Sequence, residues 1–266
     1  MKRTNFVFLA LGLLASSFVF AETADEVYNK SQTLKAPETS QCWIAVDLYN
    51  KGKHEEHRDL RQMGRDNNEL IETVFDFRSP SSVKDTRIMQ AAKANKEDDK
   101  WIYLPSLRTC RRIATAERQK SFVGTDYTYN DMDRREPGED TCDMLEENTS
   151  KKVGDKTYNC WKIKATPVKK NLEYAYKHIW IDKETYIPVY QEYYDKKDAL
   201  LKISSVEKLE IVTAPKTGKK YPMRLINKLE NVQTQHSTVI TIQKYILDEP
   251  ISSKYFTQSW LQTGKY

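Results

Sequence analysis

Hydrophobic and polar side chains alternate with a period of two along most of the chain, which is the pattern of β-strands that bury one face. In residues 42–49, Ile44, Val46 and Leu48 share one face of the expected strand. Similar runs predict further strands at residues 58–63, 70–77, 86–90, 101–104, 110–113, 141–146, 157–166, 174–182, 188–194, 200–212, 223–231 and 237–246. Because polar or Gly-bearing turns separate consecutive runs, we expect a meander of antiparallel strands.

One segment near the N-terminus has a helical period instead. Between residues 22 and 41, Ala24, Val27 and Leu34 recur near helical spacing, and Pro37 should end the helix. No other long stretch has this period, so the sequence predicts a mainly β protein with a few helices. A series of strands of this kind forms one curled antiparallel sheet or an unclosed barrel. The C-terminal tail carries three large apolar residues that require burial: Phe256, Trp260 and Leu261.

The first residues are typical of a secretory signal peptide. Lys2 and Arg3 precede an uncharged apolar run over residues 6–20, and small residues favour cleavage after Ala21. The run is shorter than the roughly 20 residues that cross a bilayer, which disfavours the alternative of a retained membrane anchor. We therefore expect residues 1–21 to be a signal peptide and residues 22–266 to form a single domain, exported to the periplasm.

Composition narrows the class of function. The 43 basic and 38 acidic residues nearly balance, so the charge does not predict nucleic-acid binding. The 16 Tyr, 8 Phe and 5 Trp residues suit sheets. Together these features describe an ordinary globular β protein.

The four cysteines of an exported chain suggest a disulfide framework. Cys142 and Cys160 lie in neighbouring predicted strands on either side of a turn-prone segment at residues 148–155. Their pairing is therefore favoured, which leaves Cys42 to pair with Cys110. Ligation of a metal by all four is disfavoured because the close pairs of a structural zinc site are missing.

Sequence motifs of catalysis are missing. The chain contains no HExxH, no GxSxG and no glycine-rich phosphate loop. His54 and His57 cluster with two glutamates beside Gly52, where a solvated turn is favoured over a metal site. We therefore expect a protein that is not an enzyme and has no cofactor or metal. A hydrolase that uses an unrecognised carboxylate pair is kept as an alternative hypothesis.

Residues 101–131 concentrate aromatic and basic side chains around Pro105 and Gly124. The arginines of this stretch have two interpretations: exposed positions that stabilise nearby acids, or contacts with an anionic head group or an acidic partner. The arginines proposed for such a contact are Arg108, Arg111 and Arg112.

The order of several motifs resembles the outer-membrane lipoprotein-sorting family, which is related to the LolA/LolB-like carriers of the bacterial periplasm. The motifs are Tyr103-Leu104-Pro105-Ser106-Leu107-Arg108, Arg111-Arg112-Ile113, Phe122-Val123-Gly124-Thr125-Asp126-Tyr127, Tyr129-Asn130-Asp131, Cys160-Trp161-Lys162-Ile163, Thr166-Pro167, residues 180–188 and Phe256-Thr257. The resemblance covers about residues 70–260.

This resemblance implies an unclosed antiparallel β-barrel with a helical lid and a hydrophobic cavity. Such a protein would carry lipids or lipoproteins by shielding their acyl chains, in some cases beside a transporter of the resistance-nodulation-division (RND) type. No cargo-binding residue of the well-studied carriers can be matched to this chain, so the identity of the cargo stays open. An alternative is a structural or adaptor subunit of an envelope transporter without cargo of its own. The aromatic and apolar residues expected at the cavity or its rim, or else in ordinary core, are Trp101, Tyr103, Leu104, Phe122, Tyr127 and Tyr129.

Overall fold

The computed structural model describes residues 21–66, 70–93, 98–133, 135–169 and 172–265, so the predicted signal peptide lies outside the described residues except for Ala21. The described residues form thirteen strands of one antiparallel sheet. The strands are β1 (Thr39–Asn50), β2 (Lys53–Asp66), β3 (Leu70–Ser79), β4 (Arg87–Lys93), β5 (Asp99–Leu104), β6 (Thr109–Arg112), β7 (Asp140–Val153), β8 (Lys156–Pro167), β9 (Tyr176–Asp182), β10 (Pro188–Tyr194), β11 (Leu200–Thr213), β12 (Lys220–Asn231) and β13 (His236–Leu247).

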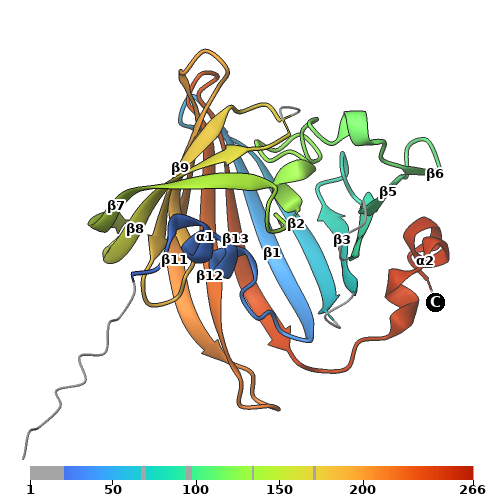
Figure 1. Ribbon diagram of the computed structural model, residues 1–266. Helices are drawn as coiled ribbons and strands as arrows, with labels where there is room; N and C mark the ends of the chain where they lie inside the picture. The colour runs from blue at the N-terminus through green and yellow to red at the C-terminus, as the bar shows by residue number, and fades with distance from the viewer. Residues whose placement is uncertain (1–20, 67–69, 94–97, 134, 170–171, 266) are drawn as a thin grey trace, which may run out of the picture.

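The strand order explains how the sheet is built. β13 is the central strand, and β1 lies beside it, paired with β13 on one side and with β2 on the other. The first six strands follow one another outward to the edge strand β6, and β7 begins at the opposite edge. Residues 113–139, which we call the crossover, join the two edges. Because β6 and β7 do not pair, the sheet is curled but unclosed (Figure 1), which confirms the predicted fold class.

The crossover and helix α1 (Ala24–Gln32) both pack against the inner face of the curled sheet (Figure 1). α1 begins with a capping box, in which Thr23 N donates to the Glu26 carboxylate at 2.8 Å and Glu26 N donates to Thr23 Oγ1 at 3.3 Å. Its buried side covers one part of the sheet through a cluster that contains Ala24, Val27, Tyr28, Trp161, Ile163, Ala165, Ile179 and Ile181. The predicted N-terminal helix is therefore confirmed, and it covers the sheet as the expected lid.

Successive residues of β2–β5 point to opposite faces, so this half of the sheet has a core on each side. The inner core includes Leu60, Phe77 and Ile88, which pack with Phe122 of the crossover. The outer core is closed by the C-terminal tail, which forms the short helix α2 (Gln258–Thr263). The predicted burial of the tail is confirmed, since Phe256, Trp260 and Leu261 are at most 7% exposed.

Two predictions about β7 and the cysteines are wrong. β7 continues to Val153, so only the end of the expected turn at residues 148–155 is a turn. Cys142 is opposite Ala165 on β8, whereas Cys160 is opposite Thr149. At about 3.3 Å per residue the two cysteines are separated by roughly 17 Å along the strand, too far for a disulfide.

The second expected disulfide is absent for a similar reason. Cys42 belongs to the inner core and Cys110 packs against the outer core, so the sheet separates them. All four cysteines are free in the structure. The turn prediction failed because β7 is an edge strand, where exposed polar side chains are common and resemble those of a loop.

Across the ranges that the structure describes, no helix has the length and apolar character needed to cross a bilayer.

Candidate ligand-binding cavity

A cavity of about 630 Å³ lies on the inner face of the sheet. Its walls come from the end of α1 and the segment after it, from strands β1–β3, β9, β10, β12 and β13, and from the end of the crossover. The volume is within the range of about 300–1,000 Å³ that small-molecule pockets usually have. The structure therefore provides room for a ligand.

One wall of this cavity is apolar and belongs to the central strands. Ile44 of β1 lies directly opposite Ile242 of β13, and both line the cavity. Ile240 extends the same wall along β13, and Met223 extends it onto β12. Cross-strand neighbours on one face of a sheet lie within van der Waals reach, so these side chains form a continuous surface.

Another part of the cavity lining is polar, where the partly buried Arg135 forms an ion pair with the buried Asp140. Arg135 donates two hydrogen bonds to Asp140, of 2.8 Å from Nε and 2.9 Å from Nη2. Tyr28 of α1 donates a third to the same carboxylate, at 2.8 Å. Burial alone would raise the pKa of Asp140, but these hydrogen bonds hold it below its ordinary value. The contacts join α1, the crossover and the start of β7.

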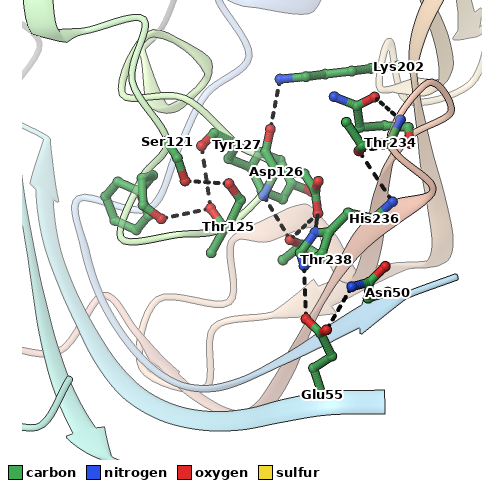
Figure 2. A network of polar contacts seen from close by, with 12 residues as sticks. Asn50, Glu55, Ser121, Thr125, Asp126, Tyr127, Lys202, Thr234, His236 and Thr238 are labelled. Atoms are coloured by element: carbon green, nitrogen blue, oxygen red, sulfur yellow. Dashed lines mark hydrogen bonds and ion pairs between the residues drawn. The ribbon is translucent and has the colours of Figure 1, made fainter. Parts of the chain in front are cut away.

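The crossover is held over the sheet by a polar network around Asp126 (Figure 2). Asp126 Oδ2 accepts from Thr238 Oγ1 at 2.7 Å and from His236 Nδ1 at 2.8 Å. The backbone contributes too, because Lys202 Nζ donates to the Asp126 carbonyl oxygen at 2.8 Å. His236 Nε2 in turn lies 3.5 Å from Glu55 Oε2. One crossover residue is thus tied to β11, β13 and β2.

Gly124 is part of a tight loop in the crossover. It has a φ of +77° and follows Val123, whose φ is +51°. Ser121 Oγ donates to the Thr125 carbonyl oxygen at 2.6 Å, and Thr125 Oγ1 donates to that of Phe122 at 2.8 Å. Two consecutive residues with positive φ reverse the chain, and a glycine at one of them limits the strain.

The six residues expected at the cavity or its rim are divided between the two cores. Trp101 and Tyr103 pack in the outer core beside α2. The other four pack with inner clusters: Leu104, Phe122, Tyr127 and Tyr129. None of the six is among the residues that line the cavity. A direct ligand contact by these side chains stays a prediction.

The three arginines expected to contact a head group also lie away from the cavity lining. Arg111 pairs with Glu117 at 2.6 Å, and Arg112 pairs with Asp99 at 2.5 Å. Arg108 is exposed in the turn between β5 and β6. Two of the three thus have acidic partners within the protein, and their contact with a head group or partner protein remains untested.

The histidine pair is part of a strand rather than of the expected turn. Both His54 and His57 lie on β2 and reach the same oxygen, Asp47 Oδ1, at 2.9 and 2.8 Å. Their hydrogen bonds hold the pKa of Asp47 below its ordinary value even though burial opposes this. No group of three or more potential metal ligands occurs among the residues that the structure describes.

Sequence reasoning missed the residues that do line the cavity. Cys42, Ile44, Ile240 and Ile242 occupy alternate positions of strands, as ordinary core residues also do. The alternation of polarity therefore identified their face but not the empty space beside them. One residue could have indicated the cavity from the sequence: Lys177, a lysine at an inward position of a strand.

The unclosed sheet with an inner cavity is a LolA-like fold, and similar solved structures share it. An outer membrane lipoprotein-sorting protein domain from Vibrio parahaemolyticus has a TM-score of 0.78 and 22% identity, covering 90% of this chain and 98% of that one. A DUF1329 family protein from Desulfovibrio piger has a TM-score of 0.77 and 21% identity, covering 90% and 97%. A LolA superfamily protein from Nitrosomonas europaea has a TM-score of 0.62 and 18% identity, covering 90% and 100%. At these identities the similarity establishes the fold.

Comparison with protein-family models shows which family the chain belongs to. A family model described as "Uncharacterized protein" matches residues 70–263, and the chain belongs to that family. No curated protein matches the sequence. The resemblance noted from the sequence motifs is confirmed as a shared LolA-like fold.

Proposed function

We propose that the protein is a periplasmic, non-enzymatic carrier or chaperone that holds the acyl chains of lipids or lipoproteins. The observation that carries this proposal is the cavity of about 630 Å³ with an apolar wall on the inner face of an unclosed sheet. Each methylene kept from water contributes about 0.8 kcal/mol, so an acyl chain gains much from such a container. The name of the Vibrio parahaemolyticus neighbour, a lipoprotein-sorting domain, supports the same class of cargo.

Two features support the remaining parts of the proposal. The N-terminal sequence has the pattern of a signal peptide, which supports a periplasmic location. The thiol that lines the cavity, Cys42, has its pKa raised to about 11 by burial. A protonated, buried thiol is a poor nucleophile, which supports a role in binding rather than in covalent chemistry.

The test is to recover cargo with the protein. Protein exported to the periplasm is purified without detergent, measured by native mass spectrometry and extracted for lipids. We expect about one bound acyl ligand per chain. The variant Ile242→Trp fills the cavity beside β13 and should emerge empty. The control Ile211→Trp changes an exposed side chain, which is 53% accessible, and should retain the ligand. Wild-type protein that is empty in every preparation would contradict carriage.

A second candidate function is that of an adaptor for an envelope transporter of the RND type. The outer face of β9 and β10 favours it, because Tyr176 and Tyr194 stack with ring centroids 4.8 Å apart and remain partly exposed. Lys164 Nζ lies 4.2 Å from the centroid of the Tyr176 ring. Partly exposed aromatic rings beside cations are common in protein interfaces.

The two functions are separated by a surface variant. Replacement of Tyr176 and Tyr194 by Ser should abolish co-purification with an inner-membrane permease if the outer face docks a partner. The lipid content should then stay unchanged. Unaltered recovery of the permease with this variant would remove the support for the adaptor.

A further inference from the structure

Lys177 is a buried cation on the inner face of β9, where it lines the cavity. Only 7% of the surface of Lys177 is exposed. The ammonium nitrogen lies 5.4 and 5.5 Å from the ring centroids of Tyr174 and Tyr193. Among the described residues, it has no carboxylate within ion-pair distance and no hydrogen-bond acceptor. The nitrogen borders the cavity, and an ammonium with so little contact with water and no anionic partner is costly, so its position requires an explanation.

The nearest carboxylates of the protein are engaged by other groups. Asp140 is held by Arg135 and Tyr28. Asp131 Oδ2 accepts from the backbone and the hydroxyl of Thr128, at 2.7 and 2.8 Å. Burial lowers the pKa of Lys177, and the more distant charges of Asp140 and Asp131 compensate only in part. These carboxylates balance the charge at long range but leave the ammonium hydrogens without partners.

The other charged groups around the cavity differ in the same way: the carboxylates have partners within the protein, whereas a cation does not. Its carboxylates are paired, for example Glu72 with Arg65 and Asp133 with Lys100. Arg224 also lines the cavity, is exposed, and forms no ion pair among the described residues. The cavity therefore offers one unpaired cation on β9, Lys177, and a second, exposed one on β12, Arg224, beside the apolar residues of β1, β12 and β13.

We propose that Lys177 binds the anionic head group of an acyl ligand whose chain lies against the apolar wall. The complementary chemistry is a carboxylate or phosphate oxygen, as in a fatty acid or an anionic phospholipid. An anionic oxygen would give the ammonium the charge-assisted hydrogen bonds that the protein does not supply. This inference rests on the proposed carrier function and narrows its ligand class to anionic amphiphiles.

Binding of charged and neutral ligands of equal chain length tests the proposal. The mature full chain is titrated by fluorescence competition with palmitate, with its uncharged methyl ester and with lysophosphatidic acid. In Lys177→Met, which keeps the length and apolar character of the side chain, we expect affinity for an anionic ligand to fall at least about tenfold. Affinity for the methyl ester should change less than about twofold. The exposed control Lys152→Met should bind all three ligands like the wild type.

The outcomes separate this inference from the carrier function. A loss confined to palmitate assigns a carboxylate ligand, and a loss confined to lysophosphatidic acid assigns a phosphate ligand. Unchanged binding of all ligands by Lys177→Met overturns the inference while the carrier function stands. Equal loss of charged and neutral ligands, with a lower melting temperature, assigns Lys177 a structural role and also overturns it. Wild-type protein that binds none of the ligands overturns both.

Discussion

Removal of the Asp126 side chain should release the crossover from the sheet. The carboxylate is 7% exposed and accepts hydrogen bonds from Thr238 and His236 of β13. In Asp126→Ala both donors lose this acceptor, and Thr238 is fully buried. Hydrogen bonds to a charged group contribute about 1.5–3 kcal/mol each. Because the two bonds share one carboxylate they are not additive, so we expect a loss of about 3 kcal/mol.

Two measurements check this expectation. Urea denaturation gives the free energy of unfolding, and limited trypsin digestion reports cleavage at the exposed Lys120 in the crossover. Asp126→Ala should be cleaved there faster than the wild type. The control Asp155→Ala alters an exposed carboxylate in the β7–β8 turn and should change neither measurement. If Asp126→Ala is within about 0.5 kcal/mol of the wild type, the network does not anchor the crossover.

Three further predictions concern other parts of the molecule. The hydrogen bond to Asp47 raises the pKa of His57, and Asp59 adds to this shift. The stability that this interaction contributes is therefore complete below the unfolded pKa of about 6.5 and is lost as the pH rises through the folded value. An NMR titration should show the raised pKa of His57, and a smaller shift in Asp47→Asn. Trp260 is 2% exposed between α2 and the sheet, so Trp260→Ala should cost about 3–5 kcal/mol in urea denaturation, and a smaller effect than about 1 kcal/mol would contradict the packing of the tail. Alkylation of denatured, unreduced protein should label four thiols by mass, whereas Cys42 and Cys160 should resist labelling in the native state; fewer than four labels would reveal a disulfide.

Much of the fold could be predicted because strand positions are encoded locally. The alternation of side chains located β10 at residues 188–194, as observed, and located the other strands to within a few residues in most cases. β7 was predicted far too short because its polar, edge-strand sequence resembles a loop. α2 was not predicted because six residues are too few to display a helical period.

The candidate site was harder to predict because it depends on residues distant in sequence. The aromatic crossover was recognised as an important segment, yet Phe122 and Tyr129 pack against each other with ring centroids 5.5 Å apart. The cysteine pairing failed in the same way, since the register of β7 and β8 decides which side chains meet. Neither the register nor the depth of a pocket is contained in a local pattern.

The sequence by itself determined a mainly β protein with one N-terminal helix and a buried C-terminal tail, since hydrophobic periodicity and turn residues act over a few positions. Its motifs also pointed to the LolA-like fold. Tertiary structure alone decided that β1 pairs with β13, which brings Ile44 and Ile242 together as one apolar wall. It also placed Lys177 at the cavity with no carboxylate within ion-pair distance among the described residues. The physical reason is that empty space and missing partners are properties of the packed chain, and arise only when distant segments meet.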